Sequence, residues 1–117
     1  MILLMSQPYF FKTQAHLLIC TDERCAVSGS KLLFQAVWSG FETEKLAYYK
    51  TGGNLRLTES GCLGACQFGP AVACYFKRGS SLQEAWYQRM TYPSTMQLAK
   101  ALQAGLELPS QGRFDTT

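Results

Sequence analysis

Hydrophobic and polar positions in the first third of the chain predict a buried strand followed by a helix. The segment Ala15–Cys20 is a short apolar run between polar flanks, which is typical of a buried β-strand. In the segment 28–40, apolar residues recur at helical spacing. They are Leu32, Leu33, Ala36 and Val37. Ser28 or Ser30 can cap the start of this helix, and Gly40 can end it.

The middle of the chain predicts a second helical piece and a second strand. Residues 41–50 carry apolar positions among helix-tolerant charges, so they can extend the helix until Gly52 and Gly53 break it. Residues 54–58 then alternate leucine with polar side chains, as a half-buried strand does.

The last third predicts a β-hairpin and a helix. Residues 71–76 and 82–90 are rich in strand-forming side chains and are separated by the turn sequence KRGSS. Residues 93–104 place leucines and an alanine on one helical face, with Gly105 after the end. Residues 107–117 predict a frayed tail.

The resulting order is strand, helix, strand, hairpin, helix. Helices between early strands imply parallel pairing, whereas the late hairpin is antiparallel. We therefore expect an α/β fold of the α+β kind, with a mixed β-sheet flanked by helices.

Composition fits one domain. The chain has 117 residues, of which 47% are apolar and 16% are charged, enough for one compact core. A net charge of +3, spread along the chain, is too small to favour nucleic acid. No apolar run approaches the roughly 20 residues that cross a bilayer, and the opening MILLM lacks the basic start and the length of a signal peptide. We expect a cytoplasmic protein that binds neither membrane nor nucleic acid.

Four of the five cysteines form two closely spaced pairs. Cys20 and Cys25 enclose four residues, Cys62 and Cys66 enclose three, and each pair follows a predicted strand. Two strands in one sheet would bring their ends to a common edge, roughly 5 to 10 Å apart. Because four thiolates complete the tetrahedral coordination of two irons, the pattern predicts a [2Fe–2S] cluster.

Glycines in the second cysteine loop favour an anionic cluster there. Gly61, Gly64 and Gly69 lack side chains, so backbone N–H groups near them can turn toward the sulfur atoms and offset negative charge. A closed zinc site also accepts four thiolates, and a dithiol–disulfide pair is the third reading. Both more often have two-residue gaps between the cysteines, so the iron–sulfur interpretation is favoured.

The fifth cysteine and the single histidine are expected outside this site. Cys74 shares one strand face with Val72 and Phe76, which indicates a small buried hydrophobic side chain. His16 is the only histidine, which excludes a Rieske-type centre because such a centre needs two histidine ligands.

Aromatic and basic side chains elsewhere are expected to be structural. Trp86 and Tyr87 on the hairpin predict packing in a core or an interface. Lys77 and Arg78 are expected on an exposed turn, and Arg24 on an exposed part of the first cysteine loop.

The cysteine motifs and their flanks resemble a known family, the thioredoxin-like [2Fe–2S] ferredoxins. The resemblance rests on HLLICTDERC, GCLGACQFGP and WYQRMTYPS and spans about residues 15–105. It implies a thioredoxin-like sheet, similarity to the small iron–sulfur subunit of NADH dehydrogenases, and members that carry one electron at a time, several as homodimers. It also implies four ligands: Cys20, Cys25, Cys62 and Cys66.

On this basis we expect an N-terminal extension at 1–14, the ferredoxin domain at 15–106 and a C-terminal tail at 107–117. We expect an electron carrier rather than an enzyme, with a protein redox partner such as a flavoprotein reductase or an oxidoreductase subunit. The alternatives are a zinc- or cluster-stapled interaction module and a subunit of a larger oxidoreductase. No G-x-G-x-x-G motif is present, so the chain is not expected to bind NAD by itself.

Overall fold

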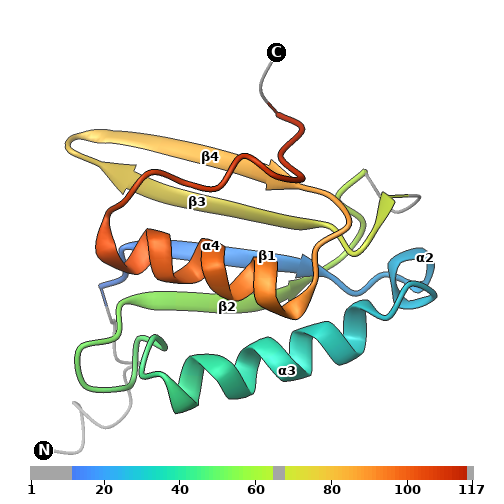
Figure 1. Cartoon of the computed structure of the whole chain (residues 1–117), viewed down its shortest axis with the longest axis horizontal. Coiled ribbons are helices and arrows are strands. Elements are labelled where there is room, and N and C mark those ends of the chain that lie inside the picture. Colours follow the sequence, from blue (N-terminus) through green and yellow to red (C-terminus); the bar gives the residue numbers. More distant parts are fainter. Residues whose placement is uncertain (1–11, 65–67, 116–117) are drawn as a thin grey trace, which may run out of the picture.

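The computed structural model describes residues 12–64 and 68–115 of the chain, which form one mixed sheet and three helices (Figure 1). The elements are β1 (Ala15–Cys20), α2 (Glu23–Ala26), α3 (Ser30–Thr43), β2 (Leu55–Ser60), β3 (Val72–Arg78), β4 (Ser81–Tyr87) and α4 (Tyr92–Ala104). The predicted order of strand, helix, strand, hairpin and helix is confirmed. The sequence pattern missed the one-turn helix α2.

The sheet has the order β2-β1-β3-β4. β1 and β2 run parallel, with Ala15 opposite Leu55 and Cys20 opposite Ser60. β1 pairs antiparallel with β3, which pairs antiparallel with β4. The mixed sheet predicted from the order of elements is therefore present. Because β1 and β2 are adjacent and parallel, both end at the same edge of the sheet.

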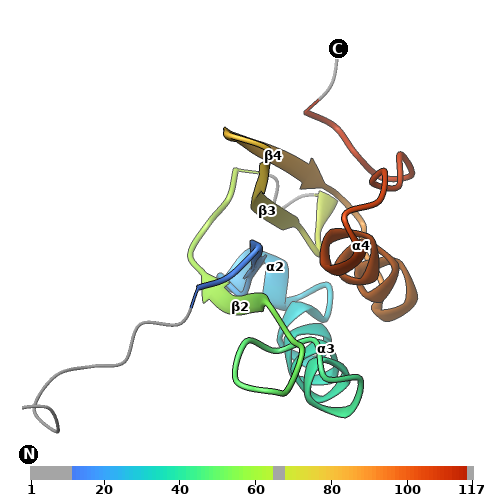
Figure 2. The same ribbon diagram turned by 90° about the vertical axis from the view of Figure 1, so that its left-hand side faces the viewer.

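Helices α3 and α4 pack on the same face of the sheet (Figure 2). The alternation of β1 explains this arrangement, because Ala15, Leu17 and Ile19 are buried and the side chains between them are partly exposed. The other core residues come from β2 to β4 and the inner faces of both helices, including Val37, Leu55, Val72, Tyr87 and Leu98. None of the helices in residues 12–64 and 68–115 has the length and hydrophobicity of a membrane span.

Helix α3 differs from the prediction at both ends. Its N-cap is Gly29, at φ +90°, rather than a serine side chain, and Ser30 is wholly buried. Gly40 does not end the helix, which continues to Thr43. A Cβ on Gly40 would lie 2.7 Å from Tyr92 Oη and 3.0 Å from two side-chain atoms of Met96. The glycine thus permits close approach of α4 and does not act as a stop signal.

The predicted second helical piece at 41–50 is wrong beyond Thr43. The chain leaves α3 through turns, and Ala47 forms a parallel bridge to Leu55 at the start of β2. Gly53 closes this loop, where a Cβ would lie 2.1 Å from Ala47 O. The loop therefore pairs with the sheet edge, a long-range contact that helical periodicity does not report.

Helix α4 and the C-terminal segment are tied to β4. Thr91 and Ser94 form a reciprocal capping box at the start of α4, and Gly105 ends it in the left-handed conformation. Tyr87 Oη donates to Pro109 O at 2.7 Å, and Phe114 N–H donates to Trp86 O at 2.9 Å. The frayed tail predicted at 107–117 is therefore wrong for the described part of that segment.

Candidate metal centre

The two cysteine loops leave the sheet from one edge, because β1 and β2 are parallel neighbours. Cys20 is the last residue of β1 and lies opposite Ser60, the last residue of β2. Thr21 N–H donates to Ser60 O at 3.1 Å, so the pairing continues into the first loop. Cys62 follows two residues after β2 ends. The predicted common edge is confirmed, with adjacent strands about 5 Å apart.

A backbone hydrogen bond holds Cys20 against the segment that precedes β3. The N–H of Cys20 donates to Ala71 O at 3.1 Å, just before β3 begins. The residue is 0% exposed and packs in a small apolar cluster with Ala71 and Leu63. Leu63 comes from the second cysteine loop, so this cluster joins the two loops. The structure thereby places Cys20 at the buried inner wall of the candidate site.

Cys62 lies at the surface and already accepts a hydrogen bond. Gly64 N–H donates to Cys62 Sγ at 3.3 Å, with Gly64 in the left-handed region at φ +83°. Cys62 itself is exposed. A backbone N–H aimed at sulfur stabilises the anionic form of that sulfur. The expectation that glycines turn backbone donors toward the cysteines is confirmed at this position.

The side chains of the other two expected ligands are not described. The backbone of Cys25 belongs to α2, whereas its side chain is not described, and the same holds for Arg24. Cys66 lies outside the described residues. No group of three or more potential metal ligands occurs among the side chains that the structure describes. Convergence of all four cysteines therefore stays a prediction.

The return path of the second loop is held between β1 and the start of α4. Phe68 O accepts from Arg89 N–H at 2.7 Å, and Pro70 O accepts from Met90 N–H at 3.0 Å. The Gly69–Pro70 peptide bond is cis. β3 begins at Val72, one residue after the predicted start at 71. These backbone bonds fix the segment that follows the Cys66 position.

Cys74 lies in the core, away from this edge. It is opposite Leu17 in β1 and Ala85 in β4 and is 0% exposed. Burial raises the pKa of its thiol from 9.0 to about 12, so the side chain stays a neutral thiol. The interpretation of Cys74 as a small buried hydrophobic residue is confirmed.

His16 also has contacts that indicate a structural role. Its Nε2 lies 2.6 Å from Thr58 Oγ1 across the parallel pair. Partial burial and then the charge of Arg56 lower the pKa of its imidazole below 6.5.

The hairpin residues are structural too, with one correction. Tyr87 is wholly buried, and Trp86 packs edge-on against Tyr75, so the prediction of packing is confirmed. Arg78 is not a free turn residue. Its guanidinium donates to Gly105 O and Leu106 O, just after α4 ends, at 3.4 and 2.5 Å. A cation there offsets the negative end of the helix dipole.

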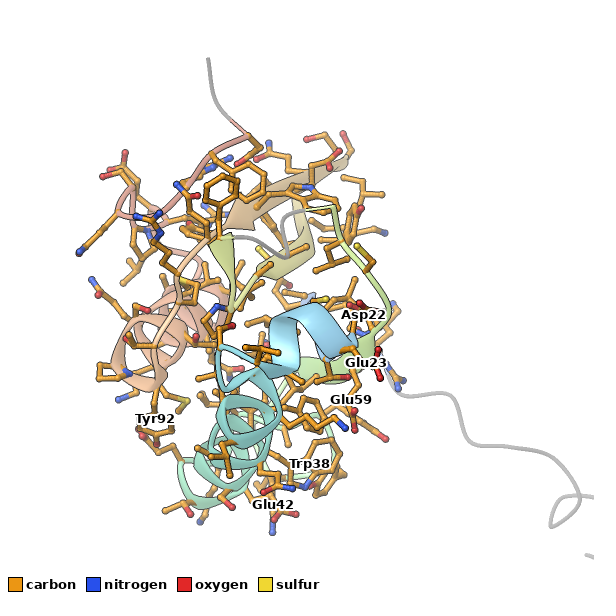
Figure 3. The ribbon with its side chains drawn as sticks, turned by 90° about the vertical axis from the view of Figure 1, so that its right-hand side faces the viewer. Asp22, Glu23, Trp38, Glu42, Glu59 and Tyr92 are labelled. Carbon is orange, nitrogen blue, oxygen red and sulfur yellow. The ribbon has the colours of Figure 1, made fainter. Side chains whose placement is uncertain are left out.

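Acidic side chains border the candidate centre. Glu59 and Asp22 lie beside the ends of β2 and β1, and Glu23 begins α2, as the view onto this edge shows (Figure 3). Thr21 Oγ1 donates to Glu59 Oε2 at 2.9 Å and so ties the two strand ends together through their side chains.

The described residues fit an iron–sulfur group. Soft sulfur donors start both loops, one at a buried strand end and one at the surface with a backbone donor on its sulfur. Thiolates with N–H···S bonds are the ligand environment of iron–sulfur clusters. The features that sequence reasoning missed are α2 and the Thr21–Glu59 link. The Thr-Asp pair after Cys20 is typical of a helix start and could have indicated α2.

Comparison with known proteins gives the same assignment. The sequence model described as "Thioredoxin-like [2Fe-2S] ferredoxin" matches residues 10–103. The curated protein "Ferredoxin, 2Fe-2S" from Aquifex aeolicus is 31% identical over 68 residues, 51% of this chain. The alignment spans 58% of the length of that relative.

Solved structures agree on the fold. The wild-type thioredoxin-like [2Fe-2S] ferredoxin from Aquifex aeolicus matches with a TM-score of 0.68 at 21% identity, covering 89% of this chain and 99% of that one. A cysteine-to-serine variant of that ferredoxin matches with a TM-score of 0.67 at 21% identity, covering 87% and 99%. The resemblance stated from the cysteine motifs is confirmed. This chain belongs to the thioredoxin-like [2Fe–2S] ferredoxin family, whose cofactor is a [2Fe–2S] cluster.

Proposed function

We propose that this chain is a one-electron carrier that holds a [2Fe–2S] cluster through Cys20, Cys25, Cys62 and Cys66. One observation carries the proposal: the parallel pairing of β1 and β2 starts both cysteine loops at the same edge of the sheet. The bound cluster would supply a site that cycles between two oxidation states one electron apart.

The two described cysteines would contribute differently. Cys20 is buried against Ala71 and Leu63, so it would shield one side of the centre from water. Cys62 is exposed, so its side of the centre would be the route by which electrons enter and leave. Gly64 N–H would offset negative charge on the Cys62 sulfur and thereby raise the reduction potential.

The remaining expectations belong to the same proposal. The chain would serve electron transfer in the cytoplasm rather than catalyse bond chemistry. Its partner would be a protein, such as a flavoprotein reductase or an oxidoreductase subunit, and it could act as a homodimer. The functional domain would be 15–106, between an extension at 1–14 and a tail at 107–117.

Metal analysis combined with a redox titration tests this function. The full chain is purified anaerobically, and iron, zinc and acid-labile sulfide are measured on one sample. We expect about two irons and two sulfides per chain, and a visible spectrum that bleaches in a one-electron step. A colourless protein with one zinc would instead support a zinc-stapled module. Stable co-purification with a flavoprotein would favour a subunit of a larger oxidoreductase.

A further inference from the structure

The outer edge of β2 has backbone groups available for another strand. β2 lies at one edge of the described sheet. Leu55 directs its N–H and C=O away from β1, to Leu46 O and Tyr48 N–H. Because backbone direction alternates along a strand, Leu57 and Glu59 direct theirs to the same side. No backbone partner for these outward groups occurs among the described residues.

An aromatic groove runs beside this edge. Its volume is about 780 Å³, and it lies between α3 and the end of β2. Its lining consists of Lys31, Phe34, Gln35, Trp38, Ser39 and Glu59. The rings of Phe34 and Trp38 are 6.0 Å apart, and Trp38 is 39% exposed. An unpaired strand edge next to such a groove is the arrangement by which proteins bind extended segments as an added strand.

The rim of the groove is acidic. Asp22, Glu23 and Glu59 gather at one end, and Glu42 lies on the other side of Trp38 (Figure 3). Among the described residues that line the groove, Lys31 is the one basic residue. This charge pattern favours an occupant with basic side chains.

The same charges disfavour the two occupants that this chain could supply. Residues 1–11 contain no lysine, arginine or histidine. A second copy pairing edge to edge through β2 would bring its own Glu59 toward this acidic rim, because a two-fold interface places the same patch on both sides. A basic segment from a different protein can pair with the outward backbone groups of β2 and can offset the negative charge of the rim.

We propose that the outer edge of β2 and its groove bind an extended, basic segment of the protein that exchanges electrons with this chain. The inference rests on the proposed electron-carrier function. The segment adds to the sheet through Leu57 and Glu59 and places an apolar side chain against Trp38. Glu59 precedes Cys62 by three residues, at most roughly 10 Å along the chain, so the partner is held next to the exposed side of the centre.

A designed peptide tests the docking site on the full holoprotein. The probe is a capped decapeptide of alternating valine and serine with three lysines at one end, made in both sequence orders and titrated by calorimetry. Its control carries N-methyl groups on alternate amides, which keep charge and side chains but block strand pairing. We expect binding that weakens with added salt, and at least a tenfold loss on N-methylation.

Matched variants locate the site. We expect Trp38→Ala and Glu59→Gln to weaken peptide binding about tenfold and about threefold, since a groove aromatic contributes more than a rim charge. Leu82→Ala removes an apolar side chain that is 70% exposed on β4, and Glu107→Gln removes an acid beyond α4. We expect both controls to change affinity less than twofold.

Each contrary outcome overturns the docking proposal. It is wrong if neither peptide binds at 1 mM, if the N-methylated peptide binds equally well, or if Leu82→Ala is as harmful as Trp38→Ala. Stronger binding after removal of residues 1–11 would assign the groove to that segment. Self-association abolished by Trp38→Ala would assign it to a second copy. Iron and sulfide measured on the same sample keep the two proposals separate, since a loaded cluster without peptide binding refutes only the docking site.

Discussion

Replacing Gly64 with alanine separates the backbone geometry of the cysteine loop from general stability. Gly64 has φ +83°, and a Cβ there would meet nothing within 4 Å, so the substitution introduces backbone strain without a clash. An L-residue in this region costs about 1–2 kcal/mol. If the loop relaxes to relieve that strain, Gly64 N–H loses its 3.3 Å bond to Cys62 Sγ. The sulfur of the reduced, more negative centre then loses a donor.

The expected result is a lower reduction potential. If the lost bond favours the reduced form by about 0.5–1 kcal/mol, the one-electron potential falls by roughly 20–45 mV. Gly79→Ala is the control, because Gly79 has φ +62° in the β3–β4 turn and also open space around its Cα. We expect Gly64→Ala and Gly79→Ala to lose similar amounts of thermal stability. Gly64→Asn should lose less thermal stability than Gly64→Ala, because asparagine tolerates the left-handed region.

Potentiometric titration of the three variants and the parent protein decides the outcome. An equal change of potential in Gly64→Ala and Gly79→Ala, or none in either, would refute the role assigned to this donor.

Cys74→Ser should keep the visible spectrum but lower the free energy of unfolding by about 1–2 kcal/mol, because a buried hydroxyl replaces the thiol. Cys62→Ser should lose the visible spectrum. The reverse pattern would contradict the ligand assignment. Since the pKa of His16 is lower in the folded chain, its contribution to stability is present above pH 6.5 and is lost as pH falls. In denaturant titrations between pH 7 and 5, His16→Gln should therefore reduce the loss of unfolding free energy on acidification. An unchanged pH dependence would argue against this role. Arg78→Gln should lower the free energy of unfolding by about 1 kcal/mol, because it removes donors from the carbonyls after α4. Lys77→Gln, at an exposed position, should leave the free energy of unfolding unchanged. Equal effects of the two substitutions in thermal melts would contradict the role assigned to Arg78.

The elements that periodicity predicts well are those whose sequence signals are local. The apolar run of β1, the hairpin and the capping signals of α4 lie within a few residues, so their patterns are complete in the sequence. Gly40 misled the prediction, because its role depends on Tyr92 and Met96, more than 50 residues away. A glycine pattern cannot distinguish a helix end from a close helix–helix contact.

The shared sheet edge at the candidate centre was predictable for a different reason. Cysteine pairs that follow two strands indicate metal ligands from their residue type and spacing alone. The parallel register of β1 and β2 then brings Cys20 and the Cys62 loop to one edge. The burial difference between these two cysteines was not predictable, because it depends on Leu63 and Ala71 meeting from separate segments. The docking of 107–115 on β4 was missed for the same reason, since single hydrogen bonds to Tyr87 and Trp86 leave no periodic signal.

The most direct test of the central claim is anomalous X-ray scattering at the iron edge from an anaerobically grown crystal of the full chain. We predict two adjacent iron peaks at the edge where β1 and β2 end, enclosed by the sulfur atoms of Cys20, Cys25, Cys62 and Cys66. A single peak that appears only at the zinc edge would contradict the claim, as would iron bound elsewhere on the molecule.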